Sequence, residues 1–539
     1  MAKWGALIVL ATAQFLMVLD QAVMNVAISQ LVEDFNTTVT TIQGVIAFYA
    51  LVMAGLMLTG GKLGDIFGRR RIFVIGMIVY ACGSAMTAVS GSVATLALGW
   101  SVLEGIGAAM VLPAMVALVA GSYEGKDRAL AYGVLGGVAG AGIAVGPILG
   151  GWATTELSWR IVFVGEVVVA LGILASIRTV REPELKPGAT LDWVGSVLSA
   201  LGLGLVVFGV LQASTWGWLK PLNSPIEPFG FSLVPFVVGA GAMVLLGFVS
   251  WERHREKIGK QPLVHLRLFR IPSLRAGAWT LLAQNMILMG IFFTIPLYLQ
   301  VVQGLDALET GVRMLPASIG MFVMAIIGSV LARRFGSRSL VRIGLLVVLG
   351  SILLLLGTIN PQLDDAGFLF AMGVLGIGIG LIVSQLGNVV QSSVGDEDRS
   401  EAGGIQNTAL QLGSSLGTAV LGAIVITGLL ISFSANVEQN PEISASVKNQ
   451  VNVAVSSGGS FVQSDEVRAA AEQAGVSATD TENVVDEYED AQLQALKTAL
   501  LGAGILVLIA LPFTRNLPTR PLGVSGGEAG VTATSLANV

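Results

Sequence analysis

The stretch Gly61-Lys62-Leu63-Gly64-Asp65-Ile66-Phe67-Gly68-Arg69-Arg70-Arg71 lies between two long apolar runs. It combines one acid with a cluster of cations and closely spaced glycines. Such a density of charge cannot lie in hydrocarbon, so the stretch is predicted to be a short turn at a membrane surface. The glycines permit a tight reversal and close helix packing. The cations place this turn on the cytoplasmic side by the positive-inside rule.

The composition indicates a membrane protein. The chain has 539 residues, of which 54% are hydrophobic and 12% are charged, whereas soluble domains carry about 25% charged residues. The basic residues are scattered over short loops and do not form one face, which argues against a nucleic-acid partner. The single Cys82 excludes an intrachain disulfide and a cysteine metal cluster.

Apolar runs of about 20 residues predict membrane helices, and the chain contains about fourteen of them. They are expected near 5–30, 40–60, 72–90, 94–119, 129–152, 160–180, 193–213, 230–251, 276–302, 308–332, 340–358, 366–390, 402–431 and 493–513. If every run crosses and the N-terminus is inside, roughly 24 cations fall inside and 5 outside. We therefore expect a multi-pass protein of the plasma (cytoplasmic) membrane with both termini cytoplasmic.

An internal repeat indicates two related halves. Leu331-Ala332-Arg333-Arg334-Phe335-Gly336-Ser337-Arg338 echoes the segment 63–70, without its acid. The predicted divisions are a six-helix bundle at 1–180, two inserted helices at 193–251, a basic cytoplasmic linker at 252–275, a second six-helix bundle at 276–513 and a disordered cytoplasmic tail at 514–539. The second bundle includes an acid-rich, extracytoplasmic polar segment, 432–492, which is expected to form short amphipathic helices. Paired repeats around a midplane site are typical of transporters.

Three carboxylates lie inside apolar runs: Asp20, Glu104 and Glu166. An ionised acid at the bilayer centre costs about 2.5–3.5 kcal/mol on insertion scales. Facing a wet cavity, such a group could exchange a proton for a cationic ligand. The alternative is a fixed acid that pairs with a polar neighbour for helix packing. Glu166, about two turns from Trp159-Arg160, could instead be solvated.

Three motifs resemble signatures of one family. The opening stretch resembles the loop between helices 2 and 3 of the major facilitator superfamily. Leu19-Asp20-Gln21-Ala22-Val23-Met24-Asn25-Val26-Ala27 resembles the first-span signature of its fourteen-helix drug:proton antiporters, which usually have Thr at the place of Ala22. Gly142-Ile143-Ala144-Val145-Gly146-Pro147-Ile148-Leu149-Gly150-Gly151 is similar to the antiporter signature of the fifth span.

The resemblance implies roles for these residues. Asp20 would be the coupling acid, Asn25 a polar cavity liner, and Asp65 with Arg69 a conformational latch. The fifth span, bent at Pro147 and closely packed through its glycines, would act as a gate. The alternatives are ordinary packing of small residues for the fifth span and topology marking alone for the loop.

The fourth span departs from the family pattern. In Trp100-Ser101-Val102-Leu103-Glu104-Gly105, Ser101 takes the place of an Arg that the family links to proton transfer. Glu104 takes the place of a Gln. Either Glu104 titrates instead, or coupling depends on Asp20 alone.

Further polar and aromatic residues are candidates for lining a cavity. They are Phe48, Tyr49, Trp100, Met110, Gln284, Asn285, Tyr298, Arg313, Gln385, Asn388, Gln406, Asn407 and Gln411. Helix packing is the alternative for each of them, and it is the favoured role for Phe48, Tyr49, Trp100 and Met110. The aromatic rings could contact a lipophilic cation. Arg313 is expected either to snorkel to the outer interface or to pair with an acid.

The sequence thus predicts an all-α membrane protein of the major facilitator fold, and not an enzyme, that exports lipophilic, often cationic drugs in exchange for protons. No phosphate-cradling Gly-x-x-x-x-Gly-Lys-Ser/Thr occurs, so the expected energy source is the proton gradient, with no cofactor and no metal. The expected partners are membrane lipids, protons and small lipophilic substrates, and the expected state is a monomer. Open alternatives are an exporter of a native metabolite (lipid, siderophore or self-made antibiotic) and a non-transporting sensor on the same fold.

Overall fold

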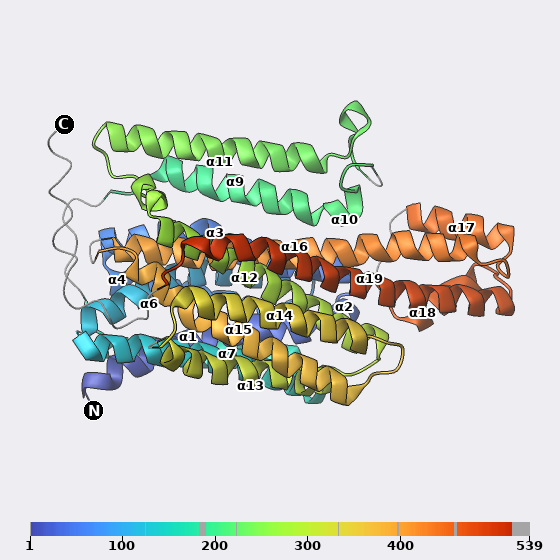
Figure 1. The fold of residues 1–539 in the computed structure, drawn as a ribbon, viewed down its shortest axis with the longest axis horizontal. Coiled ribbons are helices and arrows are strands. Elements are labelled where there is room, and N and C mark those ends of the chain that lie inside the picture. Colours follow the sequence, from blue (N-terminus) through green and yellow to red (C-terminus); the bar gives the residue numbers. More distant parts are fainter. Residues whose placement is uncertain are drawn as a thin grey trace.

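The molecule is a set of long helices lying side by side (Figure 1). The computed structural model describes residues 2–123, 125–182, 190–221, 224–332, 334–395, 398–456 and 461–519. Every regular element in these ranges is a helix, and 14 of the helices are long and apolar enough to cross a membrane. The predicted fold class is confirmed. Lys186, Arg333 and most of the predicted tail (520–539) lie outside the described residues.

The helices follow the predicted order of six, two and six. The first group comprises α1 (Ala2–Val26), α3 (Val39–Phe67), α4 (Arg69–Ala88), α5 (Val93–Leu96) continuing through η1 (Ala97–Glu104) into α6 (Gly105–Ser122), α7 (Gly125–Glu156) and α8 (Trp159–Ser176). The inserted pair is α9 (Trp193–Leu211) and α11 (Val234–Lys257). The second group comprises α12 (Pro272–Leu297) with η5 (Tyr298–Val302), α13 (Ala307–Leu331), α14 (Ser337–Thr358), α15 (Asp365–Ser392), α16 (Arg399–Gln439) and α19 (Ala478–Phe513).

Short helices join these elements. They are α2 (Ile28–Asp34), η2 (Ile177–Thr179), α10 (Ala213–Trp216), η3 (Pro228–Gly230), η4 (Leu266–Arg270), α17 (Ala445–Ser456), α18 (Ser464–Gln473) and η6 (Thr514–Asn516). We call the end of the molecule where α1 begins the near end, and the opposite end the far end (Figure 1).

The predicted surface turn is shorter than expected. Helix α3 continues to Phe67 and α4 begins at Arg69, so the reversal takes place at Gly68 alone. Its φ of 103° lies in the left-handed region, which favours glycine. The prediction of a loop over the whole stretch was wrong because charged side chains need only reach water, and a helix that projects past the apolar layer satisfies this as well as a loop does.

Two helix pairs make the most extensive contacts between the bundles: α7 packs against α13, and α3 against α16. At the first seam the backbones are in contact without intervening side chains. A Cβ placed on Gly311 would collide with the carbonyl oxygen of Pro147, and one on Gly151 with that of Ala307. Gly151, the last glycine of the fifth-span motif, therefore lets this helix approach the second bundle closely.

The inserted pair packs on the other seam. Helix α9 contacts both α3 and α16, whereas α11 packs mainly on α9 (Figure 1). At the near end Asp192 caps α9 by accepting from Gly195 N, and it also lies 3.4 Å from Arg255 of α11. This buried contact fixes the two inserted helices to each other.

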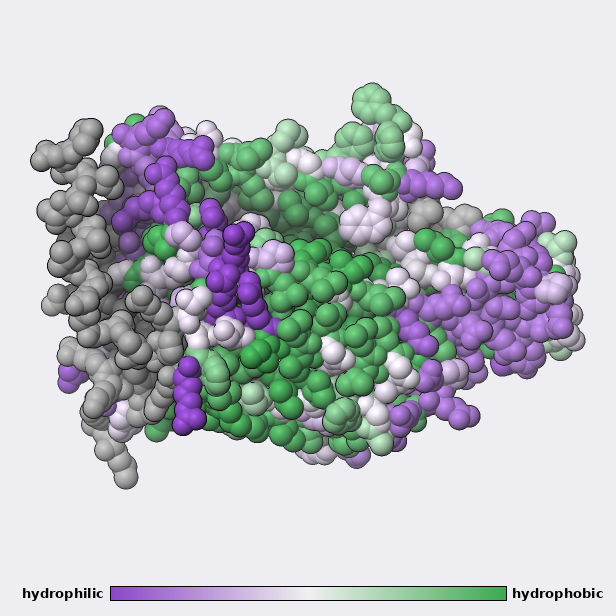
Figure 2. All heavy atoms as spheres, in the orientation of Figure 1, coloured by the Kyte–Doolittle hydropathy of each residue, from purple (hydrophilic) through white to green (hydrophobic). Residues whose placement is uncertain are grey.

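A polar protrusion extends from the far end. It consists of the ends of α16 and α19 with α17 and α18 between them, and it has a small core of Val437, Ile443, Val447 and Val484. Figure 2 shows hydrophilic residues gathered on this protrusion, and a broad hydrophobic band over the middle of the molecule. The expected short helices are present, but they connect two membrane helices that continue well beyond their apolar portions.

The α7–α13 seam predicts the effect of one added methyl group. Gly311→Ala is expected to destabilise the protein by about 1–3 kcal/mol, the usual cost of overpacking a close contact. Gly350→Ala is the matched control, since no atom of the described residues lies within 4 Å of a Cβ at that position of α14. Thermal unfolding of the purified variants measures both. Equal melting temperatures for Gly311→Ala and the wild type would contradict the contact.

Candidate functional site

The three carboxylates found in separate apolar runs converge inside the first bundle. Asp20 comes from α1, Glu104 from η1 and Glu166 from α8, and one carboxylate oxygen of each lies within 4.8 Å of the others. Their exposed fractions are 0%, 0% and 1%. We call this group the carboxylate triad. The suggestion that Glu166 is solvated was wrong, because α8 turns it into the bundle.

The position of Glu104 depends on an unusual helix. Residues Ala97–Glu104 form a π-helix, a form that often occurs at functional sites. Glycines bring this segment against α4: a Cβ on Gly83 would lie 2.6 Å from Glu104 Cγ, and one on Gly99 2.8 Å from Thr87 Oγ1. Larger residues at these two positions would push the carboxylate away from the others.

Asp20 has an aromatic wall. Trp100 Nε1 donates to Asp20 Oδ1 at 2.7 Å. The indole stacks on the buried ring of Tyr49, with centroids 4.4 Å apart and planes inclined by 7°. Both rings were candidates for a cargo cavity, and the structure places them around Asp20 instead.

Hydroxyl groups of α4 serve the other two acids. Glu166 Oε2 accepts from Tyr80 at 3.0 Å and from Ser84 at 2.9 Å. Glu104 Oε1 lies 3.0 Å from Thr87 Oγ1, which lies 2.9 Å from the carbonyl oxygen of Gly83. One hydroxyl hydrogen cannot serve both acceptors fully, so both bonds are complete when Glu104 is protonated and donates.

These donors were missed by the sequence reasoning. Tyr80, Ser84 and Thr87 are spaced by four and three residues, which places them on one face of a helix. This spacing of hydroxyls within the apolar run 72–90 was the signal that could have identified them.

The second oxygen of each carboxylate and the Tyr49 hydroxyl are buried, and none of them has a hydrogen-bond partner in the part of the chain that the structure describes. Among the described residues no ion pair involves the triad. Carboxylates this close disfavour simultaneous ionisation, so protons bind to the group as a whole. The spacing would let a small cation touch three oxygens, but hard cations such as Ca²⁺ take six to eight, and the cluster alone does not identify a metal site.

Other predicted residues of the first bundle have structural contacts. Asn25 Nδ2 donates to Gln21 O of its own helix at 2.8 Å. Asp65 pairs with Arg69 at 3.0 Å, and Arg69 Nη1 lies 3.5 Å from Ala117 O of α6. The expected latch thus joins α3, α4 and α6 within one bundle at the near end.

Two further contacts extend this near-end network. Arg70 Nη1 donates to Val180 O at 3.2 Å, and its amide donates to Glu182 Oε1. The remaining glycines of the expected loop, Gly61 and Gly64, lie within α3, near Pro113 and Arg69 respectively.

The fifth-span motif connects α7 to α1 as well as to α13. The residues nearest to a Cβ on Gly142, Gly146 and Gly150 belong to α1, and they include Val18, Ala22 and Val23. Since Asp20 lies in the same segment of α1, the helix that carries Asp20 packs directly on the predicted gate.

In the second bundle most candidate cavity residues connect helices. Asn285 Nδ2 donates to Leu410 O at 2.6 Å, and Gln385 Nε2 donates to Gly328 O at 2.9 Å. Gln406 accepts from Gln391 at 3.3 Å.

The other candidates are scattered. Gln284 is buried, and its Oε1 accepts no hydrogen bond from the described residues. Asn388 and Phe48 are exposed, and Asn407 is half-buried. Arg313 pairs with Asp365 at 2.9 Å, so the acid-pairing alternative holds. The structure does not gather these residues into one site.

Polar contacts seal the far end between the bundles. Gln43 Nε2 of α3 donates to Thr418 O of α16 at 2.8 Å. Gln300 Nε2, from η5, donates to Val26 O at 2.9 Å. Together with the contact of α7 and α13, these bonds close the space between the bundles at that end.

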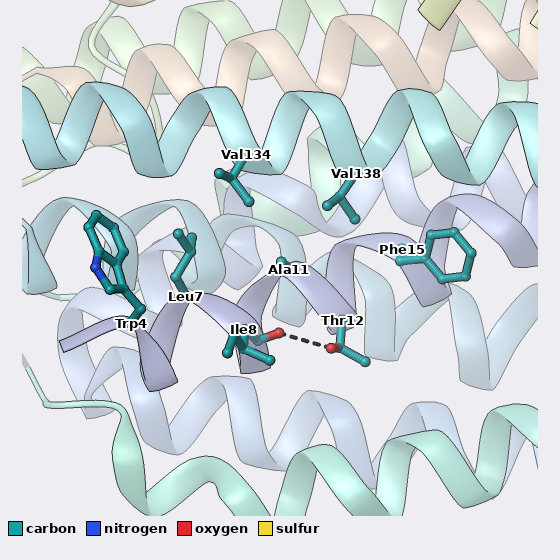
Figure 3. Close-up of a pocket in the computed structure, with 8 residues that line it drawn as sticks. All are labelled: Trp4, Leu7, Ile8, Ala11, Thr12, Phe15, Val134 and Val138. Carbon is teal, nitrogen blue, oxygen red and sulfur yellow. Dashed lines mark hydrogen bonds between the residues drawn. The ribbon is translucent and has the colours of Figure 1, made fainter. Parts of the chain in front are cut away.

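A crevice of about 530 Å³ lies between α1 and α7 in the near half (Figure 3). Its lining is almost entirely apolar and consists of Trp4, Leu7, Ile8, Ala11, Thr12, Phe15, Val134 and Val138. None of the predicted cavity residues lines it. Its volume is within the range of sites for drug-sized molecules, about 300–1,000 Å³.

Comparisons with known proteins agree on one family. The family model for the Major Facilitator Superfamily matches residues 10–418. A tetracenomycin C resistance and export protein of Streptomyces glaucescens is 30% identical, over 78% of this chain and 76% of its own. The cephamycin export protein CmcT of Amycolatopsis lactamdurans is 32% identical, over 78% and 85%. The multidrug resistance protein Stp of Mycobacterium tuberculosis is 27% identical, over 79% and 76%.

A solved structure supports the fold. A bacterial homologue of the human lysosomal transporter Spinster, inward-facing and unoccupied, superposes with a TM-score of 0.61 at 14% identity. The match covers 97% of this chain and 99% of that chain. At this identity the likeness concerns the fold alone.

The hydrogen bond of Trp100 to Asp20 predicts a stability effect. Trp100→Phe retains a ring against Tyr49 but leaves a buried carboxylate oxygen without its donor, which is expected to cost about 1–3 kcal/mol. Trp193→Phe is the control, because Trp193 is exposed on α9. Thermal unfolding of both variants tests this, and equal losses at the two positions would rule out a specific role for the indole N–H.

Proposed function

Because the chain belongs to the Major Facilitator Superfamily, and is a membrane transporter and not an enzyme, we propose that it exports lipophilic, often cationic drugs in exchange for protons. The near end lies in the cytoplasm and the far end outside the plasma membrane, in keeping with the bias of cations toward the near-end loops. The partners of this function are protons, lipophilic substrates and membrane lipids, and no cofactor takes part. The protein acts as a monomer.

The observation that carries the proposal is the burial of three carboxylates within 4.8 Å of one another. Buried acids in a membrane protein are costly, and they are typical of ion pathways and proton relays. A group of three that cannot all be ionised holds protons whose number depends on its surroundings. A conformational change that alters these surroundings therefore takes up or releases protons.

The geometry favours indirect coupling. Asp20 is fully buried behind Trp100 and Tyr49, so a cargo molecule does not compete with the proton for the same oxygen. Protonation acts instead on the packing of α1, η1 and α8, and through α1 on the gate helix α7. This replaces the direct exchange of cation for proton expected from the sequence.

The apolar crevice between α1 and α7 supports lipophilic cargo. Its volume and lining suit a drug-sized apolar molecule. A native metabolite is the second candidate, since relatives are described as exporters of tetracenomycin C and cephamycin.

Transport by Asp20→Asn tests the proposal. In liposomes, wild-type efflux of cationic and neutral drugs is expected to require a pH gradient, and the variant to be slower by about 100-fold, the usual value of a positioned proton-transfer group. Glu489→Gln, an exposed acid of the protrusion, is the control and is expected to behave as wild type.

Two results would refute proton coupling. One is undiminished efflux by Asp20→Asn in a drug-sensitive, pump-deleted host. The other is wild-type efflux that persists when the pH gradient and voltage are collapsed, or that follows a sodium gradient instead. Transport of a metabolite panel with no response to any drug would favour the second candidate.

A further inference from the structure

The buried face of α4 changes character at the triad. Toward the near end its buried side chains include Phe73 and Met77, which are apolar. Toward the far end they include Ser84 and Thr87, and Ser90 is buried just beyond the helix. Hydroxyl groups both donate and accept hydrogen bonds, so they can pass a proton, whereas the apolar side chains cannot. The polar side of the triad is therefore its far side.

The distance from the triad to the end of the bundle is also short on the far side. Glu166 lies seven residues from Trp159, where α8 begins, a distance of about 10 Å at 1.5 Å per residue. Thr87 is one residue before the last residue of α4, and Ser90 Oγ donates to the carbonyl oxygen of Thr87 at 2.8 Å. A column of three buried hydroxyls, those of Ser84, Thr87 and Ser90, thus lies between the triad and the far end within the first bundle.

An ion pair closes the top of this column. Arg160 Nη1 lies 2.7 Å from Asp34 Oδ2, and Arg160 Nη2 donates to Ser90 O at 3.1 Å. Trp159 Nε1 donates to the same carboxylate oxygen at 2.8 Å, and the guanidinium lies 4.4 Å from the centre of the indole. We call Asp34, Trp159 and Arg160 the far-end cap.

The cap is charged and only partly shielded. The side chains of Arg160 and Asp34 are 33% and 26% exposed. Burial raises the pKa of Asp34, but hydrogen bonds from Trp159, Gln30 and Arg160, with the charge of Arg160, lower it below its usual value. Asp34 therefore remains ionised and paired at neutral pH. The cap separates the hydroxyl column from the solution at the far end.

We propose that protons reach the triad from the far end through the interior of the first bundle, along Ser84, Thr87 and Ser90, and that the far-end cap closes this route. The inference rests on the proposed function and gives its proton a path separate from the cargo. The space between the bundles is sealed at the far end by the bonds of Gln43 and Gln300. A route inside the first bundle would let a proton arrive from that side while the bundles are joined there.

A leak assay without cargo tests the cap. The protein is reconstituted into liposomes that contain a pH-sensitive dye, the voltage is clamped with potassium and valinomycin, and a pH gradient is imposed. Arg160→Ala is expected to dissipate the gradient several-fold faster than wild type. Asp34→Asn, which keeps the shape of the side chain, is also expected to dissipate the gradient faster than wild type. It replaces Arg160→Ala in the test if that variant does not fold.

A second substitution tests whether the far-end cap and Thr87 lie on the same proton route. Adding Thr87→Val to Arg160→Ala is expected to return the leak to the wild-type rate. Adding Thr87→Ser to Arg160→Ala is expected to leave the faster leak unchanged. Thr280→Val is the matched control. Thr280 is a buried threonine of α12 that donates to the carbonyl oxygen four residues earlier, as Thr87 does, and it makes no hydrogen bond to a carboxylate of the described residues. The double variant with Thr280→Val is expected to leak.

In the wild-type background, Thr87→Val is expected to slow drug-driven proton movement by about 100-fold without changing the dissociation constant of the drug. Thr87→Ser is expected to restore the wild-type rate. The absence of a leak in both cap variants, or a leak that survives Thr87→Val, would overturn the proposal. If the cap variants leak as expected but the wild type moves no protons with any drug, the proposed function is refuted and the proton route still holds.

Discussion

The close approach of η1 to α4 is the constraint on which the site depends. Gly83 and Gly99 remove the side chains that would separate these helices, and the π-helical turn directs Glu104 into the gap. The result is a carboxylate that sits beside two others in an apolar bundle, where each ionised acid would cost about 2.5–3.5 kcal/mol on insertion scales. The hydroxyls of Tyr80, Ser84 and Thr87 offset part of this cost by hydrogen bonding. Packing and proton affinity are therefore set by the same contacts.

The fold could be predicted from the sequence because its signals are local. Apolar runs long enough to span a membrane gave the number and order of helices, and the glycines around Pro147 indicated a closely packed helix. The boundaries were less accurate: α3, α16 and α19 continue past their apolar portions, because helical hydrogen bonds can extend into water as long as the side chains are polar. Hydropathy marks the apolar layer and not the end of a helix.

The site could be predicted only in part. Asp20, Glu104 and Glu166 were recognised one by one, since acids in apolar runs stand out. Their convergence could not be predicted, because it depends on the rotation of three helices about their axes and on a π-helix that has no clear sequence signal. The polar residues of the second bundle were predicted to line a cavity, but Asn285 and Gln385 form hydrogen bonds to the backbones of neighbouring helices. The periodicity of a sequence does not distinguish a side chain with such a bond from one that lines a cavity.

The burial of the triad within one bundle bears on how a proton could move a transporter. In a cavity shared by both bundles, a proton and cargo can interact directly. Here α1 lies between the carboxylate triad and α7. One side of α1 carries Asp20 toward Trp100, and another side meets Gly142, Gly146 and Gly150 of α7. Helix α7 in turn contacts α13 of the second bundle at Gly151 and Gly311. Close-packed backbones transmit small displacements because no side chain can absorb them, so a change in the charge of Asp20 can act on the far-end seal through α1 and α7.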